Sequence, residues 1–220
     1  MAENKKISDG SEERKLSKAE KRRLENFQRI AGELEVQGYA AKELTASTLK
    51  ANTLGVFFGV LLAAVFVVLY FVLKRPVSEV PPKVRFVIAI VFVAEIVIHE
   101  LIHGITWSCG LKGGFRENIE FGIIWQALTP YCTCKSVIGR GRYFLGSIMP
   151  CIILGILPSI LAIIIGNVPL LVLGALNVMA AGGDLMVILM ILKNSAKGKE
   201  QLFLDHPSKI GLIVFERDGE

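Results

Sequence analysis

The sequence contains two histidines, His99 and His103, four residues apart, with a glutamate, Glu100, between them. On an α-helix, residues at this spacing lie on one face, about 40° apart around the axis. Both imidazoles can therefore reach one metal ion, and the carboxylate beside them can accept and return a proton. The pattern predicts a zinc site with Glu100 as the general base of a hydrolytic reaction. A chance occurrence of the motif is the alternative interpretation.

The surroundings of this motif favour the functional interpretation. It lies in an apolar run, residues 84–107, which is long enough to cross a bilayer as a helix. Ionisable groups at membrane depth cost roughly 3 kcal/mol or more each, so several of them together require a reason. The chain of 220 residues is 52% hydrophobic, which is too apolar for an ordinary soluble domain. Its net charge of +5 comes with basic residues that flank apolar runs, so no nucleic-acid partner is expected.

A catalytic zinc ion usually has three protein ligands and one open position, so a third ligand is required. Asp184 is the only charged residue in the apolar run 169–192. Asp184 and His99 both lie 15 residues after the start of their runs, which is about 22 Å along helices of the same direction. We therefore predict one Zn²⁺ ion bound by His99, His103 and Asp184. A structural or water-facing carboxylate is the alternative for Asp184.

Two further polar residues lie in the same apolar runs. Glu95 precedes His99 by one helical turn, where it can orient that imidazole or face a cavity without such a role. Asn177 precedes Asp184 by seven residues, on the same face of a continuous helix. Its amide can hold a substrate backbone or stabilise an oxyanion, and an interhelical hydrogen bond is the alternative.

The spans of the predicted fold follow from length and hydropathy. Four uncharged or nearly uncharged runs, 53–73, 84–107, 143–166 and 169–192, predict four transmembrane helices, with Pro150 and Pro158 as kinks in the third. Between the second and third runs, alternation over residues 119–126 predicts a strand, and residues 131–137 can return after a turn at 127–130. The predicted fold class is an all-α polytopic membrane protein with a small β-hairpin. A plain loop is the alternative for the hairpin.

Other candidates for chemistry are weaker. Cys132 and Cys134 would point to one side of the returning strand, where we interpret them as packing residues rather than metal ligands or a reactive thiol pair. His206 lies in a polar segment before a proline and is interpreted as a turn residue.

The organisation of the chain follows from these runs. Residues 1–50 are predicted to be a polar N-terminal tail with one surface helix, which begins after a capping box at Ser17. Residues 51–192 form the membrane-embedded zinc hydrolase domain, and residues 193–220 a polar C-terminal tail with at most one short strand at 212–215. Lys and Arg number 11 in the first tail, 5 between the second and third spans and 5 in the last tail. Both termini of this multi-pass cell-membrane protein are therefore expected in the cytoplasm.

The motif at His99, Glu100 and His103, with Asn177 and Asp184 in a later run, resembles a bacterial family of membrane zincin peptidases whose domain has no established function. The resemblance spans roughly residues 44–215. More distantly, the layout is similar to the site-2 proteases, which are intramembrane zinc enzymes with the same two-histidine helix. In those enzymes a glycine follows the aspartate, whereas here glycines precede Asp184 and a leucine follows it.

The predicted function is that of a membrane-embedded zinc peptidase, which hydrolyses a peptide bond with metal-activated water. Its expected partners are membrane lipid and a membrane-protein or peptide substrate. Two alternatives remain from other classes of protein. One is a non-catalytic membrane regulator or scaffold that binds zinc, and the other is a transporter that uses the intramembrane acids and histidines as a proton or metal pathway.

Overall fold

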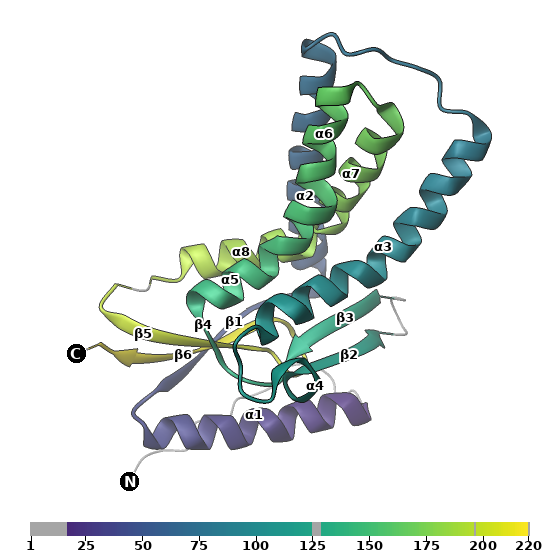
Figure 1. Cartoon of the computed structure of the whole chain (residues 1–220). Coiled ribbons are helices and arrows are strands. Elements are labelled where there is room, and N and C mark those ends of the chain that lie inside the picture. The colour runs from purple at the N-terminus through teal and green to yellow at the C-terminus, as the bar shows by residue number, and fades with distance from the viewer. Residues whose placement is uncertain (1–16, 125–128, 196, 220) are drawn as a thin grey trace.

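The computed structural model describes residues 17–124, 129–195 and 197–219. The helices are α1 (Lys18–Val36), α2 (Thr48–Val72), α3 (Pro82–Ser108), α4 (Gly114–Asn118), α5 (Arg140–Pro150), α6 (Leu157–Ile165), α7 (Val168–Ala180) and α8 (Gly182–Lys193), with a π-helical segment, η1 (Cys151–Ile156), between α5 and α6. The strands are β1 (Ala40–Ala46), β2 (Ile119–Ile124), β3 (Thr129–Cys134), β4 (Ile138–Gly139), β5 (Lys199–Asp205) and β6 (Ile210–Asp218). Figure 1 shows α2, α6 and α7 side by side in one bundle, with α5 and α8 crossing its lower end.

Three helical stretches of the described chain are long and apolar enough to cross a membrane: α2, α3 and the continuous run from α5 to α6. The pair α7 and α8 passes the same test together, but it is bent by 49°. The structure thus agrees with three to four membrane helices. The expectation of a straight fourth helix is wrong.

A close approach between α2 and α8 accompanies this bend. Gly182, the first residue of α8, faces Gly55 of α2, and a Cβ on Gly182 would lie 2.2 Å from the Gly55 carbonyl oxygen. Only glycine allows the two backbones to approach so closely. The chain therefore turns at Ala181, and α8 leaves the bundle with Asp184 in its first turn.

The third span is also irregular, as its prolines predicted. Helix α5 ends at Pro150, the π-helical segment follows directly, and Pro158 lies in the first turn of α6. A proline lacks the N–H that would close a helical hydrogen bond, which favours a wider turn at this point. In Figure 1 the chain changes direction here, so that α5 runs beside α8 while α6 rises beside α2.

The two polar ends of the chain meet in one antiparallel sheet, in the order β1-β6-β5-β4. Strand β1 pairs with β6, so that Leu44 lies opposite Leu212. The sequence predicted only a short strand at 212–215, because its unbroken apolar run stands out, whereas β1 and β5 contain charged residues and β4 has only two residues. The fold is thus mostly helical with small antiparallel sheets, and the prediction of an all-α fold beyond the hairpin is wrong.

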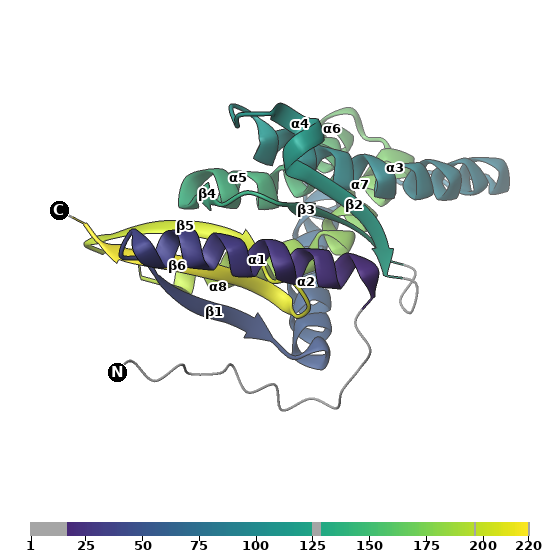
Figure 2. The same ribbon diagram turned by 90° about the horizontal axis from the view of Figure 1, so that it is seen from below.

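Both faces of the central strand β6 are covered. Ile213 and Phe215 pack against Ile30 and Leu34 of α1. Leu212 and Val214 point the other way and pack with side chains from the helices that carry the candidate site, Trp107, Tyr143 and Ile191. An unbroken apolar run is typical of a strand buried on both faces. The sheet is therefore a middle layer, with α1 beneath it (Figure 2).

The predicted hairpin is confirmed. Strands β2 and β3 pair antiparallel, with Phe121 opposite Cys132 and Ile124 opposite Thr129. The predicted returning strand extended to residue 137, whereas β3 ends at Cys134. Residues 125–128, which include part of the predicted turn, lie outside the described residues.

Candidate metal centre and adjoining groove

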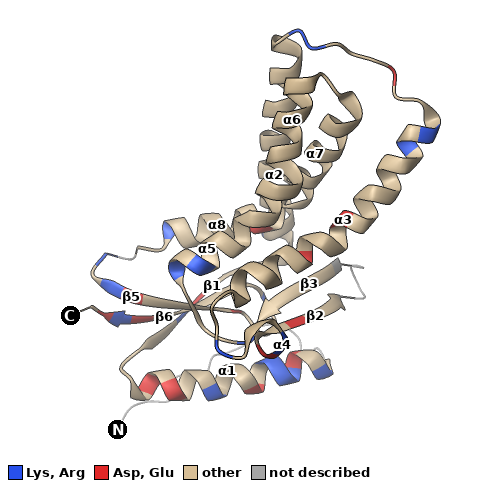
Figure 3. Cartoon of the chain, viewed as in Figure 1, with Lys and Arg blue, Asp and Glu red and all other residues tan. Residues whose placement is uncertain are grey.

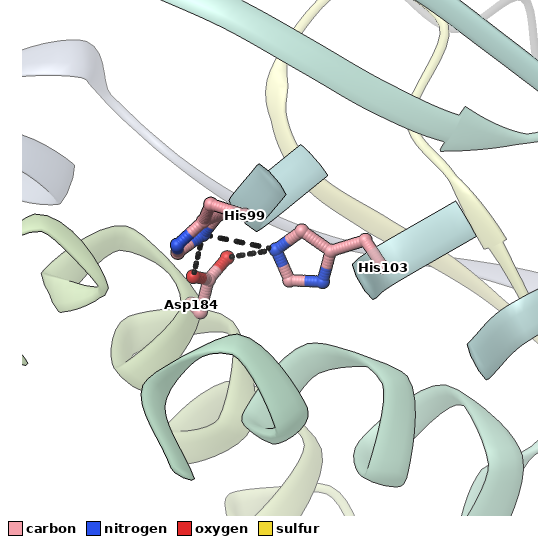
Figure 4. A group of neighbouring side chains, drawn as sticks. All are labelled: His99, His103 and Asp184. Carbon is pink, nitrogen blue, oxygen red and sulfur yellow. Dashed lines mark hydrogen bonds and ion pairs between the residues drawn. The ribbon is translucent and has the colours of Figure 1, made fainter. Parts of the chain in front are cut away.

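The three predicted metal ligands lie together (Figure 4). His99 Nε2 is 3.0 Å from Asp184 Oδ2, His103 Nε2 is 3.3 Å from Asp184 Oδ1, and the two Nε2 atoms are 3.2 Å apart. The histidines come from adjacent turns of α3, whereas Asp184 comes from the first turn of α8. The structure thus brings Asp184 to the same depth as the histidines.

These distances fit a metal site. Zinc binds histidine nitrogen and carboxylate oxygen at about 2.0–2.2 Å in tetrahedral geometry, which places neighbouring ligand atoms roughly 3.3 Å apart. One ligand atom from each of the three residues lies within 4.8 Å of the others. His99, His103 and Asp184 could therefore hold a metal ion with only small side-chain adjustments.

His103 is held in the orientation that a metal ligand needs. Its Nδ1 donates a hydrogen bond to the Gly146 carbonyl oxygen of α5, 2.8 Å away. With the proton on Nδ1, the lone pair of Nε2 points towards His99 and Asp184. Donation from the second ring nitrogen to a carbonyl or carboxylate is the usual way in which proteins fix the tautomer of a metal-bound histidine.

An aromatic side chain supports the same imidazole. The Trp107 ring stacks on the His103 ring with a centroid distance of 4.9 Å and an interplanar angle of 14°. Trp107 Nε1 donates to the Tyr143 carbonyl oxygen, and a Cβ on Gly146 would lie 2.1 Å from the indole. This support was not predicted from the sequence. Trp107 follows His103 by four residues and so shares its helix face, whereas the Gly146 carbonyl leaves no signal in the sequence.

Glu100 lines a groove that lies beside the cluster of ligands. The groove has a volume of about 280 Å³ and lies between α3 and the hairpin, lined by Val97, Glu100, Leu101, Phe121, Gly122, Ile123, Pro130 and Tyr131. The backbone N–H of Cys132 in β3 interacts with the Glu100 carboxylate, which also feels the charges of His99, His103 and Asp184. An ionisable group therefore lies between the metal-ligand cluster and an apolar groove.

Glu95 and Asn177 pair with each other. Asn177 Nδ2 donates to Glu95 Oε2 at 2.7 Å and to the Leu173 carbonyl oxygen at 3.0 Å. This is the interhelical hydrogen bond that the sequence offered as the alternative for Asn177. The bend after Ala180 separates Asn177 from the helix of Asp184. Among the described residues, Glu95 is hydrogen-bonded to Asn177 and not to His99.

Cys132 and Cys134 are free thiols in β3. Cys134 is buried in the core beside the sheet, and Cys132 packs against the same core. Burial raises the pKa of the Cys134 thiol to about 11, so it is uncharged at neutral pH. Neither belongs to the cluster of possible metal ligands, in agreement with their interpretation as packing residues.

A second carboxylate, Asp205 of β5, is held by three donors and escaped the sequence analysis. It accepts hydrogen bonds from the Tyr143 hydroxyl, from Thr133 Oγ1 at 2.7 Å and from the Cys134 backbone N–H at 3.1 Å. Desolvation raises the pKa of Asp205, while these hydrogen bonds oppose the rise. His206, the next residue, accepts from the backbone N–H groups of Ser208 and Lys209, as its interpretation as a turn residue predicted.

Comparison with known proteins supports the family assignment. Residues 91–198 match the family model described as "Putative zincin peptidase". This match includes His99, Glu100, His103 and Asp184, and it ends before β5. No curated protein and no solved structure matches the chain. The similarity to site-2 proteases therefore stays an expectation. Over residues 91–198, this chain is therefore similar to the putative zincin peptidase family.

Proposed function

We propose that the protein is a zinc-dependent peptidase embedded in a membrane, in which His99, His103 and Asp184 bind one Zn²⁺ ion. The observation that carries this proposal is the convergence of two imidazole nitrogens and both oxygens of one carboxylate, from two helices, with neighbouring atoms 3.0–3.3 Å apart. The family match over the same residues supports it independently.

The roles of the residues follow from their positions. Zinc bound there would supply a Lewis acid that polarises the scissile carbonyl and brings the pKa of a bound water to about 7. Glu100 accepts a proton from the attacking water and then donates it to the leaving amine. Gly146 and Trp107 keep the His103 imidazole in the tautomer and orientation that it needs as a ligand.

The groove beside Glu100 suits an extended peptide. Most of its lining is apolar, and one wall is the β2–β3 hairpin. A segment in extended conformation can add to the edge of such a hairpin through main-chain hydrogen bonds, while its side chains enter the apolar groove. We therefore propose a peptide segment of a membrane protein as the substrate.

The charges favour one orientation in the membrane. Lys and Arg gather on α1, the sheet and the ends of α5 and α8, while a smaller basic group lies at the opposite end of α2 and α3 (Figure 3). The positive-inside rule assigns the more basic side to the cytoplasm. We place the sheet, α1 and both described ends of the chain on that side.

The decisive experiment substitutes Glu100→Gln in the full chain. Zinc content, measured by elemental analysis of the purified protein, should stay at one ion per chain. Cleavage of a peptide substrate library should fall by about 10³-fold, within the range for loss of a general base. Glu95→Gln is the matched control, because it removes an acid from the same helix without touching the ligand cluster, and it should retain both properties.

The same measurements address the other classes of function. A zinc-binding scaffold would contain zinc but cleave nothing in either form. A transporter would move protons or zinc across a proteoliposome membrane, and Glu95→Gln would then reduce that flux. A wild-type chain without stoichiometric zinc would contradict the proposal outright.

A further inference from the structure

A second cavity lies on the other side of the hairpin, away from the groove at Glu100. Its volume is about 260 Å³, and it is lined by residues of α1, β2, β3 and β5 and by Lys135, which follows β3. Its lining is predominantly polar: Arg22, Arg23, Asn26, Glu120, Thr133, Cys134, Lys135, Leu204 and Asp205. A cavity of this size accommodates a small polar molecule, and its charged lining differs from the mostly apolar lining of the groove at Glu100.

The acidic side chains of this cavity already have partners. Glu120 Oε1 lies 3.5 Å from Arg22 Nη2, which compensates its charge, although this buried oxygen accepts no hydrogen bond from the described residues. Asp205 accepts from the Tyr143 hydroxyl, Thr133 Oγ1 and the Cys134 N–H. These contacts occupy both oxygens of the Asp205 carboxylate, and Glu120 forms its ion pair with Arg22 rather than with Arg23 or Lys135.

Two cationic side chains of the cavity lack such partners. Within the described parts of the chain, no acidic group pairs with Arg23 or Lys135, and Arg23 Nε is buried without a hydrogen-bond acceptor. The Arg23 guanidinium lies 4.7 Å from the centre of the Tyr131 ring, which provides no acceptor for Nε. A buried donor without a partner destabilises the fold, so an acceptor in the cavity would be bound favourably.

We propose that this cavity binds a phosphate monoester, with Arg23 and Lys135 as its principal ligands and Arg22 at its edge. A phosphate monoester carries a charge of about −1.5 to −2 at pH 7 and three acceptor oxygens, which match two unpaired cations and the free Arg23 Nε–H. Arginine is suited to this role because its planar group donates two parallel hydrogen bonds to an oxyanion. The phosphate monoester comes either from a soluble metabolite or from the headgroup of phosphatidic acid.

The site is connected to the groove through one side chain. Tyr131 stacks against Arg23 on the cavity side and lines the groove that contains Glu100. A ligand that fixes the Arg23 guanidinium therefore also restrains Tyr131 and strand β3. Bound phosphate should reduce local opening of the hairpin, which slows amide hydrogen exchange over residues 129–134.

The test uses the full chain and measures binding, so it does not depend on peptidase activity. Glycerol 3-phosphate is titrated into the protein in phosphatidylcholine nanodiscs, with the affinity taken from calorimetry and hydrogen exchange followed by mass spectrometry. In a second arm, the protein in detergent is mixed with phosphatidic acid or phosphatidylcholine, and bound lipid is counted by native mass spectrometry. Saturable binding in the first arm assigns a soluble ligand, and selective retention of phosphatidic acid alone assigns the lipid.

The variants Arg23→Gln and Lys135→Gln should each weaken binding by about tenfold, as expected for loss of one charge-assisted hydrogen bond. Lys135→Gln should fold normally, because its ammonium group has no partner in the described chain. Lys21→Gln is the matched control, since it removes the same charge from the exposed side of α1. The absence of binding in both arms, a loss equally large in Lys21→Gln, or unchanged binding by Lys135→Gln overturns the proposal. Unchanged hydrogen exchange with ligand bound overturns its link to the hairpin.

Discussion

Two partly buried aspartates, Asp184 and Asp205, have opposite environments. Asp205 accepts three hydrogen bonds from neutral donors, the Tyr143 hydroxyl, Thr133 Oγ1 and the Cys134 N–H. Its acceptor capacity is satisfied by the protein itself. Asp184 instead faces two imidazole nitrogens, with His99 Nε2 at 3.0 Å from Oδ2 and His103 Nε2 at 3.3 Å from Oδ1.

Asp205 is therefore a structural carboxylate, whereas the atoms around Asp184 are arranged so that a cation could bind among them. In the Asp205 cluster each donor meets an acceptor, as is usual for buried polar groups. In the Asp184 cluster the carboxylate oxygens and the two Nε2 atoms converge within 3.0–3.3 Å, and a divalent ion in their midst would bind them all. The comparison predicts that the two aspartates respond differently to the same substitution.

The largest expected effect is on zinc binding by Asp184→Ala. Loss of one of three ligands should lower the affinity for Zn²⁺ on the order of 100-fold or more, because even contacts that merely orient a ligand contribute 10–100-fold. Competition with a chelating dye measures the affinity. Asp205→Ala serves as the control at the other carboxylate and should bind zinc as the wild type does. If the wild type, Asp184→Ala and Asp205→Ala bound Zn²⁺ with equal affinity, the proposed difference between the two aspartates would be wrong.

The same Asp205→Ala substitution should instead reduce the free energy of unfolding. It leaves the donors of Tyr143, Thr133 and Cys134 without an acceptor, at a cost of about 2 kcal/mol after partial compensation by water. Equilibrium unfolding of the apoprotein in mixed micelles provides the measurement. If the variant is as stable as the wild type, the three hydrogen bonds contribute nothing to the fold.

A smaller effect is expected for Gly146→Ala. The added methyl group would overlap the Trp107 ring and displace it from His103, which should weaken Zn²⁺ binding by about tenfold, or about 1.4 kcal/mol. Gly141→Ala on the same helix is the matched control, because no atom lies within 4 Å of a Cβ at that position. An undiminished affinity would mean that the stacking of Trp107 does not position the imidazole.

The smallest effect concerns pH. Because desolvation raises the pKa of Asp205 in the folded state, the folded protein binds a proton more tightly than the unfolded chain. The free energy of unfolding contributed by this residue should therefore fall as pH rises from its ordinary pKa, about 3.9, to its raised value. Asp205→Asn cannot titrate, so this pH dependence should be absent from the variant. Over this pH range, the change in the free energy of unfolding should differ between the wild type and the variant by about 1 kcal/mol or less. A steeper decrease of the free energy of unfolding with pH in Asp205→Asn than in the wild type would contradict a raised pKa of Asp205.

Much of the site was predictable because its chemistry is local. His99, Glu100 and His103 lie within five residues on one helix, so helical geometry alone places the two imidazoles on one face. The placement of Asp184 followed from equal depth in two spans, although its helix is not straight. The bend does not carry Asp184 away from His99, because Asp184 lies in the first turn of α8, directly after the bend.

The sequence also determined the apolar spans and the hairpin, because hydropathy and alternation depend only on neighbours along the chain. The tertiary structure alone decided that β1 and β6, more than 160 residues apart, share a sheet beneath the site. It also decided that Asn177 pairs with Glu95, that the Gly146 carbonyl fixes His103 and that the charges around Arg23 are unbalanced. Each of these depends on side chains or backbone groups brought together from distant segments, and a one-dimensional pattern does not encode which distant groups meet.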